Sequence, residues 1–355
     1  MDALITVLAG DGIGPEVTRA GVAVLERIAE LSGHRFRYSE QLIGGAAIDD
    51  AGEPFPANTK ASCAESDAIL LGAVGGPKWS DPNARVRPEQ GLLALRAELE
   101  VFANLRPVRI YPELAGASPI KQERLQGVDL MVVRELTGGI YFGEKSRDED
   151  SASDLCTYHR YEIERIVRVA ARLATQRQSR VCSVDKANVL ETSRLWRDVC
   201  STTMAEEFPR VALEHMLVDA AAMHLINRPA EFDVMVTENM FGDILTDEAS
   251  MLAGSLGMLP SASLGKSPRG LFEPIHGSAP DIAGKDMANP CGMIASVAMM
   301  LRHSLALDED AALVERALES VIAEGARTAD LAGGDDAVLS TSEMTQAILG
   351  KLEQS

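Results

Sequence analysis

The sequence lacks the features that mark several large classes of protein. No apolar run is long enough to cross a bilayer, and the first ten residues lack the basic region and apolar stretch of a secretory signal. The five cysteines have neither the paired spacing of a zinc site nor that of a disulfide framework. These absences predict a cytoplasmic protein with reduced, buried thiols. The cysteines are Cys63, Cys156, Cys182, Cys200 and Cys291.

Positive charge is also scarce. The chain has 34 Lys and Arg residues against 53 Asp and Glu residues, and its formal net charge is -19. Nucleic acids and anionic membranes would be repelled by such a chain on average, so neither is an expected partner. An anionic substrate would therefore have to meet a local cluster of basic side chains.

What is present indicates an α/β protein. With 355 residues, of which 46% are hydrophobic, the chain can bury a large core and divide into two domains. Short β-branched runs alternate with segments of helical period, which is typical of a largely parallel sheet. The expected strands are residues 4–9, 68–74, 128–133, 180–184, 211–218 and 232–237, and the expected helices include 17–31, 161–177 and 192–207. The acidic, Ser-rich residues 146–154 should form either a plain loop or an arm reaching a partner subunit.

The most informative stretch is residues 238–250, which places Asp243 and Asp247 four residues apart in a helical pattern. Residues at i and i+4 share one helix face. Two like charges held close together are costly unless a cation or a proton lies between them, which favours a divalent metal site. A solvated acidic face is the alternative, because carboxylates also suit the first turn of a helix.

Three glycine-bearing segments could approach a phosphate or a nucleotide. Residues 10–16, Gly-Asp-Gly-Ile-Gly-Pro-Glu, lie where a strand turns into a helix, but their spacing is not that of a dinucleotide fingerprint, and a tight turn is the simpler interpretation. Residues 75–79 are equally ambiguous. Residues 273–290 combine turn residues, hydrogen-bond donors and an acid in a long loop, which favours a ligand-binding role.

Together these segments resemble a known family. The residues that carry the likeness are 10–16, Arg96 with 102–107, 134–143, 184–190, 238–250 and 273–290. They are similar to the isocitrate/isopropylmalate dehydrogenase family, and in particular to bacterial 3-isopropylmalate dehydrogenases, over essentially the whole chain. The resemblance implies a two-domain α/β fold that is not a Rossmann fold. One domain would comprise residues 1–100 plus 254–355 on the cofactor side, and the other residues 101–253 with the dimer interface, metal and catalytic residues.

The activity that the resemblance implies is the NAD-dependent oxidation and decarboxylation of (2R,3S)-3-isopropylmalate to 4-methyl-2-oxopentanoate and CO2 in leucine biosynthesis. Magnesium or manganese would be held by Asp243 and Asp247 of one subunit and Asp219 of the other. The smallest competent unit would therefore be a homodimer. In its own sequence context Asp219 has another interpretation, as a helix N-cap before Ala220.

Three arginines match the family's carboxylate clamp: Arg96, Arg106 and Arg134. The role suits them because a planar guanidinium can grip a carboxylate with two parallel hydrogen bonds. Taken singly, Arg96 could be a surface residue on a helix, and Arg134 could belong to a structural ion pair.

The resemblance also assigns an apolar contact and the proton transfers. Leu92 and Leu93 would contact the isopropyl group, together with Val189 of the second subunit, although leucines are more often core residues. Lys186 of the second subunit would remove the hydroxyl proton, and Tyr141 would be the acid that reprotonates the enol. Both of these assignments depend on the motif context.

For NAD, the resemblance implies a site between residues 75–89 and 277–289, with Glu89 near the nicotinamide amide. Asp281 would discriminate, because a carboxylate accepts the ribose hydroxyls and repels the extra phosphate of NADP. The expected contacts are Gly76, Glu89, His276, Gly277, Ser278, Ala279, Asp281, Ile282 and Asn289. Two residues depart from the family pattern: Asp286, where a small or neutral residue is common, and Leu217, where many relatives carry an aromatic residue.

Two other functions stay open. A relative acting on homoisocitrate, isocitrate or tartrate would keep the arginines and aspartates but would want polar or small groups in place of Leu92 and Leu93. A noncatalytic metal and organic-acid binding protein could use the same scaffold, but the retention of Lys186 and Tyr141 argues against it.

Overall fold

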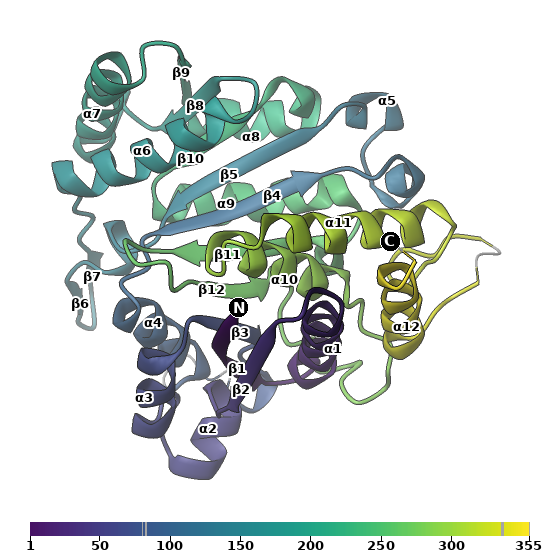
Figure 1. The fold of residues 1–355 in the computed structure, drawn as a ribbon. Helices are drawn as coiled ribbons and strands as arrows, with labels where there is room; N and C mark the ends of the chain where they lie inside the picture. Colours follow the sequence, from purple (N-terminus) through teal and green to yellow (C-terminus); the bar gives the residue numbers. More distant parts are fainter. Residues whose placement is uncertain (80, 82–83, 335–336, 355) are drawn as a thin grey trace. The chain divides into compact units, whose positions relative to one another are not determined.

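The structure is a computed structural model that describes residues 1–79, 81, 84–334 and 337–354. The chain divides into two compact units, one made of Met1–Val101 with Gly254–Ser355 and the other of Phe102–Ala253. Each unit carries its own strands and helices (Figure 1). The α/β architecture expected from the sequence is confirmed.

The first unit is built on strands in the order β2-β1-β3-β12-β11. Neighbouring strands are parallel except β11 and β12, which are antiparallel. The strands are β1 (Asp2–Gly10), β2 (Arg35–Glu40), β3 (Ala68–Ala73), β11 (Pro260–Leu264) and β12 (Leu271–Pro274). The helices are α1 (Gly14–Ser32), α2 (Gly44–Ala51), α3 (Ala57–Glu65), α4 (Pro88–Glu98), α10 (Cys291–His303), α11 (Asp308–Ala323) and α12 (Thr341–Leu352), with 3-10 turns η1 (Pro77–Trp79) and η6 (Leu256–Met258).

Helix α1 shows how the local sequence sets these elements. Val17, Val24 and Ile28 recur at helical spacing and are buried, as an amphipathic helix requires. The helix ends at Gly33, whose φ of 71° is the left-handed conformation that glycine adopts at little cost. The helix expected over residues 17–31 is confirmed.

The second unit is built on strands in the order β4-β5-β10-β8-β9. In this order β4 and β5 are antiparallel, and the other neighbouring strands are parallel. The strands are β4 (Ala103–Arg109), β5 (Asp129–Glu135), β8 (Arg180–Asp185), β9 (Ala212–Leu217) and β10 (Val234–Thr237). The helices are α5 (Gln122–Leu125), α6 (Arg160–Thr175), α7 (Glu191–Glu207), α8 (Val218–Asn227) and α9 (Asn239–Ser250), with 3-10 turns η2 (Pro112–Ala117), η3 (Gly139–Tyr141), η4 (Pro229–Glu231) and η5 (Met251–Ala253).

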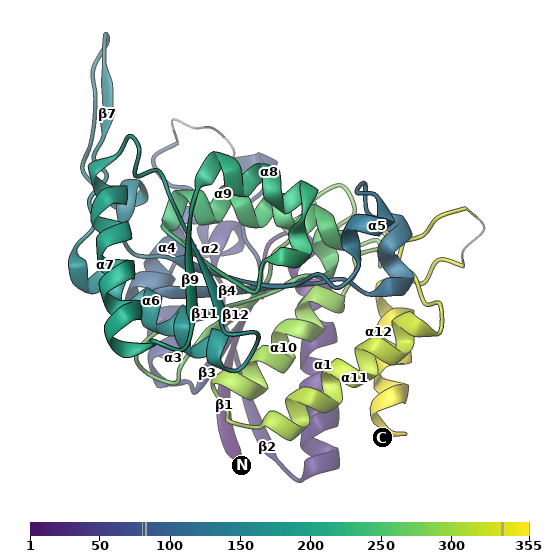
Figure 2. The same cartoon turned by 90° about the horizontal axis from the view of Figure 1, so that it is seen from above.

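The acidic segment at residues 146–154 folds as part of a small hairpin. Its strands are β6 (Lys145–Arg147) and β7 (Ala152–Asp154), and all six strand residues are exposed. Figure 2 shows this hairpin extending away from the rest of its unit. The plain loop considered from the sequence is therefore wrong, and the interpretation as an arm stays a prediction.

The cysteines and the charged surface agree with the composition. All five cysteines are free, and all are buried except the half-buried Cys156.

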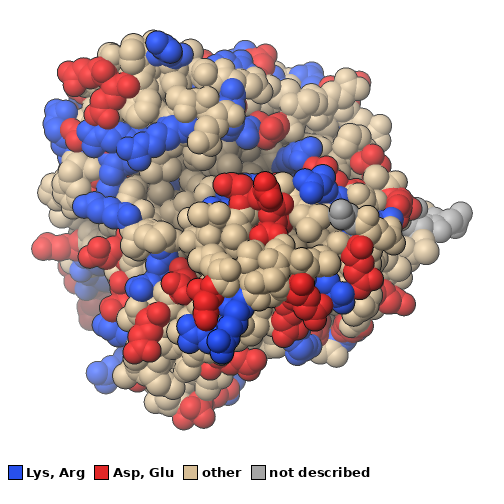
Figure 3. Space-filling view, viewed as in Figure 1, with Lys and Arg blue, Asp and Glu red and all other residues tan. Residues whose placement is uncertain are grey.

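In Figure 3, basic side chains gather at the upper left, where Figure 1 draws α6. Part of this charge is neutralised within the unit, because Arg165 pairs with Glu135, and Arg168 pairs with Glu207. Every helix in the described part of the chain is too short or too polar to cross a membrane.

Candidate functional site

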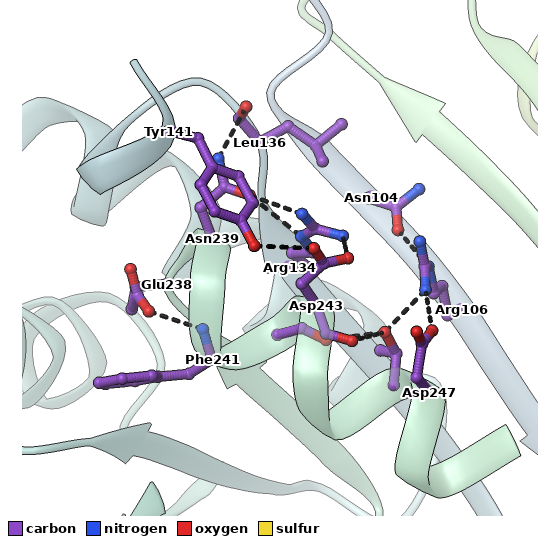
Figure 4. A network of polar contacts seen from close by, with 12 residues as sticks. Asn104, Arg106, Arg134, Leu136, Tyr141, Glu238, Asn239, Phe241, Asp243 and Asp247 are labelled. Atoms are coloured by element: carbon purple, nitrogen blue, oxygen red, sulfur yellow. Dashed lines mark hydrogen bonds and ion pairs between the residues drawn. The ribbon is translucent and has the colours of Figure 1, made fainter. Parts of the chain in front are cut away.

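A network of charged side chains surrounds helix α9 in the second unit (Figure 4). The helix begins after Glu238, whose carboxylate accepts a hydrogen bond from the backbone N–H of Phe241 at 2.6 Å and so caps the first turn. Asp243 and Asp247 lie one turn apart on this helix, as their spacing predicted. The side chain of Asp243 is 38% exposed and that of Asp247 is 71% exposed.

Arg134, near the carboxyl end of β5, is buried against α9. Its Nη1 donates to Asp243 Oδ1, while its Nε and Nη2 donate to Asn239 Oδ1 at 3.1 and 2.8 Å. Asn239 donates in turn to the backbone carbonyls of Leu136 and Gly138. The guanidinium is thus held in one orientation by a side chain that is itself fixed.

Gly242 makes this close packing achievable. A Cβ at position 242 would lie 2.7 Å from Arg134 Cγ and 2.2 Å from Thr237 Oγ1. Such distances are shorter than van der Waals contact, so any larger residue would force the arginine or the helix to move.

Arg106 lies on β4 beside the second aspartate. Its Nε donates to Asn104 Oδ1 at 2.8 Å, its Nη1 donates to Thr246 Oγ1 at 2.7 Å, and Asp247 Oδ1 lies 3.6 Å from Nη1. Although the Asp247 side chain is 71% exposed, the surrounding protein atoms remove part of its hydration, which raises its pKa; Arg106 lowers this pKa, and the negative charge of Asp243 raises it. Each aspartate therefore has an arginine beside it, and the negative charges of the two carboxylates repel each other.

Tyr141 joins the same network from the η3 turn. Its hydroxyl donates to Asp243 Oδ2 at 2.9 Å, and the Arg134 guanidinium lies 5.9 Å from the centre of its ring. Burial and the neighbouring Asp243 raise the pKa of Tyr141 to about 12, so the hydroxyl keeps its proton at neutral pH. The structure thus brings together Arg106, Arg134, Tyr141, Asp243 and Asp247, although their chemical roles stay predictions.

Lys186 and Asp219 form a separate pair. Lys186 follows β8, Asp219 lies in the first turn of α8, and the Lys186 Nζ to Asp219 Oδ1 distance is 2.6 Å. The hydrogen bond from Lys186 is the main cause that lowers the pKa of Asp219. The N-cap of α8 is Leu217 rather than Asp219, so the N-cap interpretation of Asp219 is wrong, because the helix begins directly after β9.

The three aspartates do not meet within one chain. Over the part of the chain that the structure describes, no three His, Cys, Asp or Glu side chains are close enough together to hold a metal ion. Val189, on the loop after Lys186, is 61% exposed. The single chain therefore separates the Lys186 and Asp219 pair from the two aspartates of α9.

In the first unit, α4 carries the third arginine and the leucine pair. Arg96 donates from Nη2 to Glu273 Oε1 at 3.0 Å, and its side chain is only 12% exposed, so the surface-residue alternative for Arg96 is wrong. The leucine of α4 that is fully buried is Leu95. Leu92 is half-buried and Leu93 is 39% exposed, so the core-leucine alternative is wrong for Leu93.

The loop over residues 276–290 also lies in the first unit. His276 donates from Nδ1 to the Gly277 carbonyl at 2.9 Å, its Nε2 is buried without a hydrogen-bond partner in the structure, and burial lowers the pKa of His276. Asp281 is exposed. Two non-glycine residues of the loop have left-handed backbone, Ala279 with a φ of 37° and Asp286 with a φ of 55°.

Asn289 uses its side chain within the fold. Its Nδ2 donates to Asp330 Oδ2 at 3.0 Å, and its Oδ1 accepts from the Cys291 N–H at 3.0 Å. Ser255 and Thr328 also donate to the Asp330 carboxylate. The side chain of Asn289 is thus engaged within the fold, and its contact with a cofactor stays a prediction.

Several residues of these sites were not predicted from the sequence. They are Asn104, Asn239 and Thr246 around the arginines, Glu273 opposite Arg96, and Asp330 beside Asn289. The first four lie inside stretches that the motifs already singled out. Asp330 lies in no such stretch, and only folding brings it to Asn289.

Comparison with known proteins defines the class of this one. A family model for isocitrate/isopropylmalate dehydrogenase matches residues 4–348. The chain therefore belongs to the isocitrate/isopropylmalate dehydrogenase family and is a dehydrogenase.

The relatives are more specific. The chain is 57% identical over 357 residues to 3-isopropylmalate dehydrogenase from Anaeromyxobacter dehalogenans, covering 99% of this chain and 100% of the relative. It is 56% identical over 350 residues to 3-isopropylmalate dehydrogenase from Bacillus subtilis, covering 97% and 95%. Among solved structures, isocitrate dehydrogenase from Methylococcus capsulatus has a TM-score of 0.87 at 35% identity, covering 99% and 100%. A β-decarboxylating dehydrogenase from Thermococcus kodakarensis has a TM-score of 0.81 at 35% identity, covering 99% and 96%.

Proposed function

We propose that this chain is an NAD-dependent 3-isopropylmalate dehydrogenase of leucine biosynthesis that converts 3-isopropylmalate to 4-methyl-2-oxopentanoate and CO2. The observation that carries the proposal is the 57% identity over 99% of the chain to a relative of that name. The network around α9 offers the cationic and acidic groups that oxidation and decarboxylation of a malate require. A cytoplasmic location belongs to the same proposal.

The arginines would bind the substrate carboxylates. Arg106 and Arg134 are buried cations in a chain with a net charge of -19, so they offer the local positive charge that an anionic substrate needs. Asn239 holds the Nε side of Arg134, which leaves Nη1 on the side of Asp243. Arg96 would complete the clamp from α4.

The acidic residues fit a hard divalent cation. Asp243 and Asp247 offer carboxylate oxygens on one helix face, and Asp219 of the partner subunit would be the third ligand. Desolvation is the largest cause of the raised pKa of Asp247, and the negative charge of Asp243 adds to it, so a bound cation would favour the ionised form of Asp247. When bound, Mg²⁺ or Mn²⁺ would supply positive charge against the negative charge that develops on the substrate oxygens.

Two residues would move the protons. Tyr141 holds its proton and points at Asp243, so it would deliver that proton to the carbon atom left after CO2 departs. Lys186 of the partner subunit, as the neutral amine, would accept the proton of the substrate hydroxyl, and Asp219 would hold the ammonium group that results. Leu92, Leu93 and the partner's Val189 would contact the isopropyl group.

NAD would bind along the first unit and accept the hydride. The proposed contacts are Gly76, Glu89, His276, Gly277, Ser278, Ala279, Asp281, Ile282 and Asn289. Glu89 Oε1 lies 3.1 Å from where a Cβ of Gly75 would stand, so its carboxylate lies against the Gly75–Gly76 turn. The exposed Asp281 carboxylate would favour NAD over NADP.

A homodimer would complete the site. Several large apolar side chains of the second unit are exposed, and apolar surface that is covered by a partner would account for them. They include Leu155, Val189, Met223, Ile226 and Ile244. Ile244 directly follows Asp243 on α9, and Met223 lies four residues after Asp219 on α8, so an interface here would bring metal ligands of two subunits together.

A substrate panel tests the proposal. We expect NADH absorbance to appear with 3-isopropylmalate and Mg²⁺, and to disappear when a chelator removes the metal. Isocitrate, homoisocitrate and tartrate should react far more slowly, because Leu93 presents an exposed apolar surface. Faster turnover of any of these three acids, or unchanged activity after thorough chelation, would contradict the proposal.

A further inference from the structure

Asp11 is a buried carboxylate that binds three backbone groups. Its oxygens accept hydrogen bonds from the N–H groups of Gly45, Ala46 and Gly75, each at 2.8 Å. Gly45 and Ala46 belong to the first turn of α2, and Gly75 precedes the Gly76 to Trp79 turn. Hydrogen bonds to an ionised acceptor are stronger than neutral ones, so this carboxylate holds α2 and the Gly75 turn at a set separation.

The two residues after Asp11 contact a different segment. The Ile13 N–H donates to the Ser278 carbonyl at 2.8 Å. Gly12 has a φ of 59°, and a Cβ at that position would lie 1.9 Å from the same carbonyl oxygen. Only glycine permits this approach, since a Cβ would overlap the oxygen and the left-handed backbone would be strained.

One five-residue turn therefore touches both segments that we propose to bind NAD. Asp11 holds the Gly75 side, while Gly12 and Ile13 hold the Ser278 side. We infer that the turn at residues 10–14 is a positioning device, in which Asp11 and Gly12 set the spacing between the Gly75–Gly76 turn and the loop at residues 276–289. The inference relies on the proposed function for the identity of the ligand, but the mechanical coupling does not depend on it.

The first test replaces Asp11 with asparagine. The amide keeps the shape but turns one acceptor into a donor that faces a backbone N–H, so a bond is lost and the coupling loosens. We expect the Kd for NAD, measured by titration calorimetry, to rise by about tenfold, with the KM for 3-isopropylmalate and kcat changing less than about twofold. Amide hydrogen exchange should quicken at residues 276–282, which Asp11 does not touch.

Asp67→Asn is the matched control. Asp67 also holds strand β1 by accepting a backbone hydrogen bond, from Leu4 at 2.7 Å, but at the other end of the strand. We expect it to leave the Kd for NAD and the exchange at residues 276–282 unchanged. If D11N and D67N have equal NAD affinities, or if D11N quickens exchange at Gly75 alone, the positioning role is wrong.

A glycine pair gives an independent test, which decides the matter if D11N does not fold. Gly12→Ala adds both left-handed strain and the overlap with Ser278, whereas Gly33→Ala adds left-handed strain at a φ of 71° with no atom within 4 Å. We expect only G12A to quicken exchange at residues 276–282 and to weaken NAD binding. Equal exchange in G12A and G33A would overturn the inference. If the wild-type protein does not bind NAD, the proposed function fails, and the exchange data still decide the coupling.

Discussion

At the scale of single residues, the hydrogen-bond partners of each charged side chain set its orientation. Arg134 is held by Asn239 and faces Asp243, and Asp243 also accepts the Tyr141 hydroxyl. One carboxylate thus connects the arginine, the tyrosine and the proposed metal site. Removing one of these side chains changes the hydrogen bonding of the others, so their effects on activity should not be additive.

The first prediction separates the two halves of the reaction. Tyr141→Phe removes the hydroxyl that would reprotonate the product carbon but leaves the arginines in place. We expect overall turnover to fall by on the order of a hundredfold, with hydride transfer reduced much less. Single-turnover measurements of NADH formation and CO2 release check this. Equal loss of both steps would show that Tyr141 does not act only in the later one.

The second prediction concerns cofactor choice. Asp281→Ser removes the exposed carboxylate that would repel the extra phosphate of NADP. We expect the preference for NAD, expressed as the ratio of the two kcat/KM values, to fall by about tenfold. Steady-state assays with both cofactors measure it. An unchanged ratio would mean that another residue sets the specificity.

At the scale of elements, hydrogen bonds from a few side chains connect loops to helices, as the loop at residues 276–290 and helix α12 illustrate. Asp286 was noted as a departure from the family pattern, and its carboxylate accepts from the N–H and the hydroxyl of Ser342 at the start of α12. Its φ of 55° is unfavourable for most residues but tolerated by aspartate. Burial by itself would raise the pKa of Asp286, but the hydrogen bonds, chiefly those from Ser342, lower it. Its stabilisation is therefore present at neutral pH and is lost as pH falls through the lowered pKa.

The third prediction separates strain from hydrogen bonding at this loop. Asp286→Ala and Asp286→Gly lose the same bonds to Ser342, but only glycine relieves the left-handed backbone. We expect the alanine variant to be less stable than the glycine variant by about 1 kcal/mol, with both below the wild type. Urea unfolding at neutral pH measures the difference. If the two variants were equally stable, the backbone at position 286 would not be strained.

At the scale of the whole molecule, the proposed site needs two chains. Lys186 and Asp219 are paired with each other, while Asp243 and Asp247 face the arginines. A chain lacking Lys186 and a chain lacking Asp243 would then carry complementary defects. In a mixed dimer, one site would receive an intact residue from each subunit.

The fourth prediction follows from this complementation. Lys186→Ala and Asp243→Ala should each be inactive alone, whereas unfolding and refolding them together in equal amounts should restore about a quarter of wild-type activity, because half of the dimers are mixed and each has one intact site. Failure to recover activity, with dimers verified by sedimentation, would exclude the shared site.

A surface pair tests the proposed interface. Ile244→Glu places a charge on the exposed apolar surface of α9, while Leu31→Glu alters an exposed leucine of α1 as the control. We expect only I244E to sediment as a monomer and to lose activity. A fully active I244E monomer would contradict the homodimer.

The sequence by itself determined the features that repeat over short distances. The helical period buried Val17, Val24 and Ile28, and the spacing of Asp243 and Asp247 placed them one turn apart on a helix, because side-chain direction follows directly from local backbone geometry. The motifs also identified the family, which its matching model bears out. The strand boundaries were close, although β9 ends one residue earlier than expected, because α8 begins at Val218.

Only the tertiary structure decided which of these side chains meet. Arg134 and Asp243 are 109 positions apart, and Asp11 reaches Gly75 across 64 positions. Such contacts depend on the order of the strands and on close approaches that glycines 12 and 242 permit, and no local periodicity encodes them. The pairings of the aspartates were likewise decided by the fold, which holds Asp219 against Lys186 and leaves Asp243 and Asp247 on α9 facing the arginines.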